Sequence, residues 1–256
     1  RHIIFRMIAL VLGLMVLGLM VPAGCASDPQ QPPSTPTPSA STPSASTPNS
    51  TPSALPVPTS SPPAVTAQAA RAKLAGLRTI ARDRRTPPYS RSAFGGSWAD
   101  VDGNGCNQRD DVLLRDAVPD TVVVGQQGRC DHDVLAGQWV DPYTGRTLTF
   151  EDLKNLSQAQ AIQIDHVVPL AEAWRSGADS WPAQRRELYA NDLRGLLAVD
   201  GPANMSKGDG DPAAWRPRKG FQCAYAKRWI NTKARWDLGV EPSERRALEE
   251  MLDYCR

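Results

Sequence analysis

The sequence predicts an α+β fold in a single, mostly helical domain, residues 64–256, that is stapled by disulfides. Several segments carry apolar residues at helical spacing. Between them lie apolar, β-branched runs bounded by turn residues, which are typical of strands. Four cysteines fall in this span, an even number, and its length is sufficient for one domain with a real hydrophobic core.

The first 25 residues predict export. A basic start precedes the uncharged apolar run 7–21, which is short for a membrane span but typical of a signal peptide. The tetrapeptide that ends at Cys25 is similar to a bacterial lipoprotein cleavage site, so Cys25 is the candidate lipid-bearing residue. Plain secretion stays open as the alternative. Either route places the domain outside the cell, at its surface or beyond it.

Residues 26–63 are Pro, Ser and Thr with almost no charge and no aromatic residue. Nothing in them offsets the entropy of ordering, so we expect a disordered linker. Their proline content favours an extended, semi-rigid spacer.

The elements of the domain follow from local patterns. Between residues 66 and 83, apolar side chains fall on or near one helical stripe, which predicts a helix: Ala70, Leu74, Leu77 and Ile80. The apolar, β-branched runs 112–124 and 139–150 predict strands, with a turn at 141–145. Residues 171–189 predict one or two short helices, broken at Gly177 and Pro182.

Asp, Gly and Asn alternate in residues 100–111, and two interpretations are open. A calcium-binding loop shares this alternation, but the bidentate Glu of an EF-hand is absent at its spacing. We therefore favour a tight glycine turn pinned by Cys106. Arg109 is a candidate substrate-binding residue, because a fixed guanidinium suits a phosphate.

With Cys25 set aside, the cysteines support export, because an exported domain oxidises its thiols. Three connectivities are possible for the remaining four. We predict Cys106–Cys130 with Cys223–Cys255, which closes the shorter loops. No C-x-x-C pair is present, so the cysteines do not indicate a zinc site.

The most informative stretch begins with Ile-Asp-His-Val-Val-Pro-Leu, residues 164–170. β-branched residues flank Asp165-His166, and Pro169 ends the run, which predicts a strand. Alternation along the strand places Asp165 and His166 on opposite faces. A histidine at a strand end next to a carboxylate suits a proton acceptor beside a metal ligand.

The same stretch ends with Asp-Gly-Pro-Ala-Asn-Met-Ser-Lys-Gly, residues 200–208, after a predicted strand at 196–199. Asp200 or Gly201 can cap a helix, and Pro202 suits its first position. Asn204 and Lys207 then share one face at a spacing of three. A neutral oxygen ligand and a cation on one face suit a divalent metal and a phosphate.

In these two motifs the chain resembles the HNH, or ββα-metal, nucleases. It is most similar to the secreted bacterial branch whose nuclease domain is shared with the C-terminal part of GmrSD-type restriction enzymes. The likeness covers most of the chain from about Tyr89 to Cys255. It implies a ββα-metal core, or His-Me finger, that hydrolyses phosphodiester bonds with one divalent cation, Mg²⁺ or Mn²⁺.

The resemblance also implies a role for each motif residue. Asp165 and Asn204 would hold the cation, His166 would take a proton from water, and Lys207 would sit near the phosphate. The middle Asn of these nucleases, thought to brace the loop of the base, falls at Gly195 here; we expect Asn191 to compensate. One metal and a histidine base imply a nicked strand as product.

The overall charge of +2 excludes a wholesale basic coat for nucleic acid. Basic residues gather late, interleaved with aromatic residues, between 215 and 236. They form either a solvated helix face with Trp229 and Trp236 in the core or a surface that follows phosphates, with Arg218 and Lys219 as candidate substrate-binding residues. We expect a monomer that acts on nucleic acid, with DNA favoured and RNA open.

Two other functions stay open. If Gly195 marks a decayed site, the chain is a non-catalytic binding protein of the cell surface. A hydrolase of wall polymer is suggested only by the export signal and the spacer, since no paired-carboxylate or zinc-peptidase pattern supports it.

Overall fold

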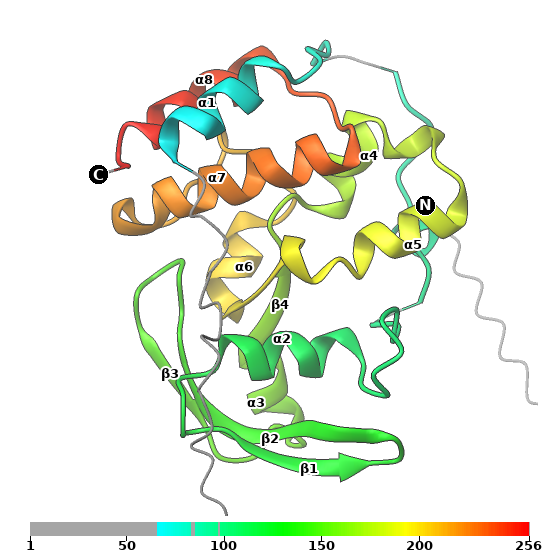
Figure 1. Ribbon diagram of the computed structural model, residues 1–256, viewed down its shortest axis with the longest axis vertical. Helices are drawn as coiled ribbons and strands as arrows, with labels where there is room; N and C mark the ends of the chain where they lie inside the picture. Colours follow the sequence, from blue (N-terminus) through cyan, green and yellow to red (C-terminus); the bar gives the residue numbers. More distant parts are fainter. Residues whose placement is uncertain (1–65, 83–84, 97, 256) are drawn as a thin grey trace, which may run out of the picture. The chain divides into compact units, whose positions relative to one another are not determined.

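A computed structural model describes residues 66–82, 85–96 and 98–255, all of which belong to one compact unit (Figure 1). The predicted signal peptide, Cys25 and the linker 26–63 lie outside the described residues. Within the described ranges, no helix is both long and apolar enough to cross a membrane.

Helices and strands are both present, which confirms the α+β class. The α-helices are α1 (Ala67–Ala75), α2 (Gln108–Asp116), α3 (Leu156–Ala161), α4 (Leu170–Ser176), α5 (Ala183–Ala190), α6 (Gly201–Lys207), α7 (Lys219–Trp236) and α8 (Pro242–Leu252). Three 3₁₀ turns are η1 (Arg91–Phe94), η2 (Ala178–Ser180) and η3 (Leu193–Gly195). The strands are β1 (Val123–Gln127), β2 (Cys130–Val140), β3 (Thr147–Phe150), β4 (Ile162–His166) and β5 (Leu196–Asp200).

The strands form two small antiparallel sheets, β1-β2-β3 and β4-β5. In the second sheet Asp165 pairs with Leu197, and His166 pairs with Leu196. Every residue of β5 is buried, because this strand lies between two apolar clusters. Leu197 and Val199 belong to one cluster, whereas Leu196 and Ala198 belong to the other. β5 is therefore packed on both faces.

The larger apolar cluster lies among the helices α1, α4, α7 and α8. In Figure 1, α1 and α8 lie beside α7, at the end of the unit away from β1, β2 and β3. Trp229 of α7 is fully buried there, and its indole donates to Glu244 of α8 at 2.6 Å. Trp229 thus lies in the core, and Trp236 packs against the same cluster. Both positions agree with the interpretation of the basic segment as a helix whose tryptophans face the core.

Two predicted elements differ from the structure. The run 112–124 is not one strand, because its first residues belong to α2. Asn107 caps that helix by accepting from the backbone N–H groups of Arg109 and Asp110, and Asp110 and Asp111 lie in its first turn. The capping and the charge at the helix N-terminus outweigh the β-branched Val112. Helix α1 is also shorter than predicted and ends before Gly76, although Leu77 and Ile80 are still buried.

The predicted disulfides are confirmed as Cys106–Cys130 and Cys223–Cys255. The first joins the start of β2 to the turn before α2. The second joins α7 to the residue that follows α8 and its final turn. Two disulfides in a domain of this size fit an extracellular location.

Candidate functional site

The paired strands β4 and β5, together with α6, bring the two motifs together. β5 runs directly into α6, and the Asp200 side chain accepts from the Ala203 backbone N–H at 3.1 Å, which caps the helix. Pro202 lies in the first turn, as predicted. The next turn of α6 places Asn204 and Lys207 against β4.

Lys207 and Asp165 form a buried ion pair. The Lys207 ammonium donates to Asp165 Oδ1 at 2.8 Å and to the His166 carbonyl at 2.9 Å, and its side chain has no exposed surface. Burial raises the pKa of Asp165, although Lys207 acts in the opposite direction. Burial also lowers the pKa of Lys207. The predicted phosphate contact of Lys207 stays a prediction, since its ammonium is here engaged by the β4 strand.

Tyr143, which no sequence motif indicated, completes this cluster. Its hydroxyl donates to Asp165 Oδ2. Burial raises the pKa of Tyr143 well above its usual value, so the phenol keeps its proton. Tyr143 lies in the turn between β2 and β3, 22 residues before Asp165. No local pattern links the two residues, although the turn itself was predicted.

A pocket of about 410 Å³ lies beside Asp165, on the face of β4 that also carries Gln163. Asn204 lines it, and its side-chain amide donates to Gln163 Oε1 at 2.8 Å. Asp209 lines the same pocket. Carboxylate and amide oxygens therefore converge here, and these are the ligands that hard divalent cations prefer.

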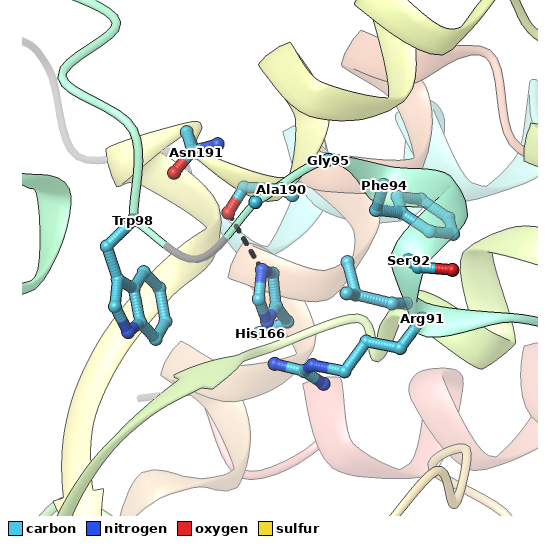
Figure 2. A pocket seen from close by; sticks show the side chains of 10 residues that line it. Arg91, Ser92, Phe94, Gly95, Trp98, His166, Ala190 and Asn191 are labelled. Atoms are coloured by element: carbon cyan, nitrogen blue, oxygen red, sulfur yellow. Dashed lines mark hydrogen bonds between the residues drawn. The ribbon is translucent and has the colours of Figure 1, made fainter. Parts of the chain in front are cut away.

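His166 faces a different pocket, of about 260 Å³ (Figure 2). Its Nε2 lies 2.8 Å from the Ala190 carbonyl, and because that oxygen only accepts, Nε2 carries the proton. Nδ1 makes no hydrogen bond within the described part of the chain and is left as an acceptor. Burial lowers the pKa of His166 to about 4, so the ring is neutral at pH 7.

Trp98 and Arg91 flank the His166 ring in Figure 2, and neither was identified from the sequence. The Trp98 indole is nearly parallel to the imidazole, with an angle of 11° and ring centres 6.0 Å apart. The backbone φ of Trp98 is +52°, a conformation that side chains other than glycine rarely adopt. Trp98 has no periodicity or motif around it that would signal this contact.

Asn191 holds the segment that carries Trp98. Its side-chain oxygen accepts from the Ala99 backbone N–H at 3.0 Å, and its amide donates to the Glu187 carbonyl at 2.9 Å. Asn191 is 2% exposed and lines the pocket of His166. The catalytic role predicted for Asn191 stays a prediction, and its contacts are those of a residue that positions its neighbours.

Gly195 occupies the position predicted for the middle Asn. Its carbonyl accepts from the backbone N–H of Val167, next to His166, at 2.9 Å. A Cβ at Gly195 would meet only the Thr232 side chain, at 3.9 Å, which is ordinary contact. The backbone therefore braces the residue after the histidine without a side chain at position 195.

The other candidate substrate-binding residues lie outside both pockets. Arg109 is partly buried, and its guanidinium donates to the carbonyls of Ala159 and Ile162, at 3.1 and 3.4 Å, where α3 leads into β4. Arg218 and Lys219 are exposed at the start of α7. Their predicted contacts with substrate stay predictions, and the contacts of Arg109 are structural.

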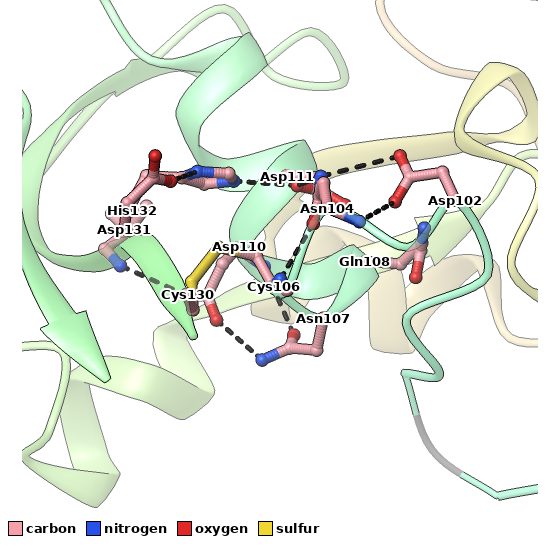
Figure 3. Close-up of polar contacts among 12 residues, drawn as sticks. Asp102, Asn104, Cys106, Asn107, Gln108, Asp110, Asp111, Cys130, Asp131 and His132 are labelled. Atoms are coloured by element: carbon pink, nitrogen blue, oxygen red, sulfur yellow. Dashed lines mark hydrogen bonds and ion pairs between the residues drawn. A yellow bond between two sulfur atoms is a disulfide. The ribbon is translucent and has the colours of Figure 1, made fainter. Parts of the chain in front are cut away.

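The loop before α2 uses its polar side chains internally (Figure 3). Asp100 accepts from the backbone N–H groups of Gly103 and Gly105, both with positive φ, as the predicted glycine turn requires. His132 lies beside the Cys106–Cys130 disulfide, between Asp131 and Asp111, at 2.7 and 2.8 Å from their carboxylates. The two cysteines approach His132 as a metal-binding group would, but their sulfurs are bonded to each other.

Comparison with known proteins identifies the class. Residues 108–251 match the family described as GmrSD restriction endonucleases, C-terminal domain. The chain is also 39% identical over 209 residues to an uncharacterized secreted protein of Arthroderma benhamiae, which covers 80% of this chain and 93% of that protein. No solved structure matches the chain.

The family match thus identifies a nuclease-related domain. The chain belongs to the family of the GmrSD restriction endonuclease C-terminal domain. The bacterial origin that the resemblance implied stays a prediction.

Proposed function

We propose that this protein is an exported, metal-dependent endonuclease of the HNH type, which hydrolyses phosphodiester bonds of nucleic acid, with DNA favoured over RNA. In this proposal β4, β5 and α6 form the ββα-metal core. The observation that carries the proposal is the state of His166: it is buried and neutral, its Nε2–H is bound to Ala190, and Nδ1 is left as an acceptor at a pocket. These are the properties of a general base.

The residues around Asp165 fit a hard divalent cation, Mg²⁺ or Mn²⁺. Asp165 and Asn204 line one pocket and would hold the ion. Each oxygen of Asp165 accepts one hydrogen bond, from Lys207 or Tyr143, and keeps a second lone pair. Bound there, the cation would stabilise charge on the phosphate and on the leaving oxygen.

The remaining roles in this proposal follow from the contacts that each side chain makes. His166 Nδ1 accepts the proton of the attacking water, while the Ala190 carbonyl fixes the ring. Lys207 holds the Asp165 carboxylate, and a direct phosphate contact would require it to leave that bond. Asn191, through Ala99, keeps Trp98 against the imidazole. A single general base predicts that each event cuts one strand.

Export is supported by the two disulfides and by the similarity to a secreted protein of Arthroderma benhamiae. Whether Cys25 carries a lipid is a separate part of the proposal, as is the monomeric state. Labelling with a radioactive fatty acid in an exporting bacterial host tests the anchor, with Cys25→Ser as the control.

Conversion of supercoiled plasmid to the open circle tests the proposal. The purified protein should nick DNA with Mg²⁺ or Mn²⁺ and should stop when EDTA is added. Cleavage that resists EDTA would contradict the metal. Binding without any cleavage would favour the rival interpretation, a non-catalytic surface protein, for which the engagement of Asp165 by Lys207 is the supporting observation.

A further inference from the structure

A further pocket, of about 440 Å³, is lined by cationic side chains from three separate elements. We call it the basic cradle, and its cationic residues are Arg115 of α2, Arg194 of η3, and Lys227, Arg228 and Arg235 of α7. Asn231 and Thr232 complete the lining, and no carboxylate is part of it. None of its residues lines either of the two pockets beside β4.

The guanidinium groups of the cradle are crowded. Arg115 and Arg228 both donate to the Leu196 carbonyl, at 2.8 and 3.4 Å. Burial lowers the pKa of Arg228, and the charge of Arg115 lowers it further. Two cations that share one acceptor repel each other, so this arrangement favours a bound anion.

The carboxylates nearby compensate only part of this charge. Asp116 pairs with Arg115, and Asp192 pairs with Arg235. The side chains of Arg194 and Lys227 have no hydrogen bond or ion pair within the described ranges. The cradle therefore has a surplus of positive charge in a concave site.

A buried hydroxyl of the cradle also lacks a partner. Thr232 is 3% exposed, and its Oγ1 makes no hydrogen bond although it is buried. A buried polar atom without a partner is costly, so Thr232 is a position where a bound group could compensate after a small movement. The five cationic side chains of the cradle are charged donors, which suit phosphate.

The cradle adjoins the candidate catalytic residue. Thr232 and His166 both line one narrow cavity, together with Gly195. Arg194 directly precedes Gly195, whose carbonyl holds the backbone next to His166. A nucleic acid strand carries a phosphate at every nucleotide. A strand bound at His166 therefore has further phosphates within reach of the cradle.

We propose that the basic cradle binds backbone phosphates of the nucleic acid substrate, away from the bond that is cut. This inference rests on the proposed nuclease function for its ligand. It adds the cationic residues of the cradle to the candidate substrate-binding residues predicted from the sequence.

The test uses Arg194→Ala combined with Lys227→Ala, because neither side chain makes a contact that the fold needs. A matched double variant, Arg129→Ala with Arg246→Ala, removes two exposed cations elsewhere. Binding of a fluorescein-labelled DNA duplex is measured by anisotropy in EDTA over a range of salt concentrations. Loss of two phosphate contacts should reduce the slope of log K against log salt by about 1.8, and the control should retain the slope of the unmodified protein.

The outcomes separate this inference from the proposed function. An unchanged slope in the cradle variant, in a protein that still nicks plasmid, would overturn the cradle and leave the nuclease intact. A reduced slope in a protein that nicks no DNA would support the cradle and remove the nuclease. A cradle variant that loses only its binding to phosphatidylglycerol vesicles, with the DNA slope unchanged, would assign the site to lipid phosphate and overturn the inference.

Discussion

Two Asp-His pairs occur in this domain, and they behave in opposite ways. Asp131-His132 lies at the start of β2, and Asp165-His166 lies at the end of β4. His132 is held between two carboxylates, whereas His166 bonds a neutral carbonyl and leaves Nδ1 without a partner. Each histidine follows an aspartate, but His132 bonds both Asp131 and Asp111 of α2, whereas His166 bonds the Ala190 carbonyl at the end of α5.

The pKa values of the two histidines are shifted in opposite directions. Burial would lower the pKa of His132, but the hydrogen bonds and charges of Asp111 and Asp131 raise it. Burial lowers the pKa of His166 to about 4, with no carboxylate to oppose it. The ion pairs of His132 thus favour its charged form, whereas the His166 ring is a neutral acceptor at pH 7. Only the second suits a base that must accept a proton from water.

The largest expected effect separates the two histidines by activity. His166→Ala should reduce plasmid nicking by roughly 10²–10⁴-fold, the usual contribution of a general base. His132→Ala is the matched control and should nick at the rate of the unmodified protein. Initial rates at saturating Mn²⁺ measure both. Equal activity of His166→Ala and the unmodified protein would remove His166 from the mechanism.

The disulfides should matter for stability and not for chemistry. Cys130→Ser opens the bridge beside His132, and Cys255→Ser opens the one between α7 and the end of α8. Closing loops with separations of 24 and 32 residues contributes roughly 3–4 kcal/mol in the chain-entropy model. Each variant should therefore melt at a clearly lower temperature, yet nick plasmid at a temperature where it is still folded. Loss of activity in a folded variant would link the bridge to the site.

The two aspartates should differ in metal binding. Asp165→Asn keeps hydrogen-bonding atoms for Lys207 and Tyr143 but removes the negative charge of a proposed ligand, so Mn²⁺ affinity should fall by about 10-fold or more. Asn204→Ala should weaken it less, because Asn204 carries no charge. Asp131→Asn is the control and should leave the affinity unchanged. Calorimetric titration with Mn²⁺ measures these affinities. Unaltered binding in Asp165→Asn would place the metal at another site.

The smallest effect is a pH dependence of stability at His132. Its pKa is raised in the folded state, so its ion pairs stabilise the fold fully below the unfolded pKa, about 6.5. That stability is lost as pH rises through the higher folded pKa. The melting temperature of the unmodified protein should therefore exceed that of His132→Asn most at pH 5.5. A difference that grows from pH 5.5 to pH 9 would contradict the pairing.

Local patterns were sufficient for the elements that carry the motifs. The strand of His166, the cap at Asp200 and the helix breaks at Gly177 and Pro182 depend on neighbours in the sequence, and all are present. The disulfide pairing followed from loop length and is also confirmed.

Contacts between distant segments were beyond those patterns. Tyr143 and Trp98 reach the two motif residues from other parts of the chain. Arg109 suited a phosphate by its chemistry, but the fold brings the carbonyls of Ala159 and Ile162 to it instead. The periodicity of the sequence does not indicate which distant segment packs on a given face of a strand or helix.

Helix α1 opens the described part of the domain, and α8 lies near its other end, yet the two pack together. Arg245 of α8 donates to the carbonyls of Leu74 and Leu77, and Arg71 of α1 pairs with Asp253. A chain that crosses a membrane from its N-terminus therefore delivers α1 long before the partner that covers it. In the proposed function, the native fold closes only after translocation has passed Cys255, on the side where thiols are oxidised. The proposed nuclease would then mature away from the genome of the cell that makes it.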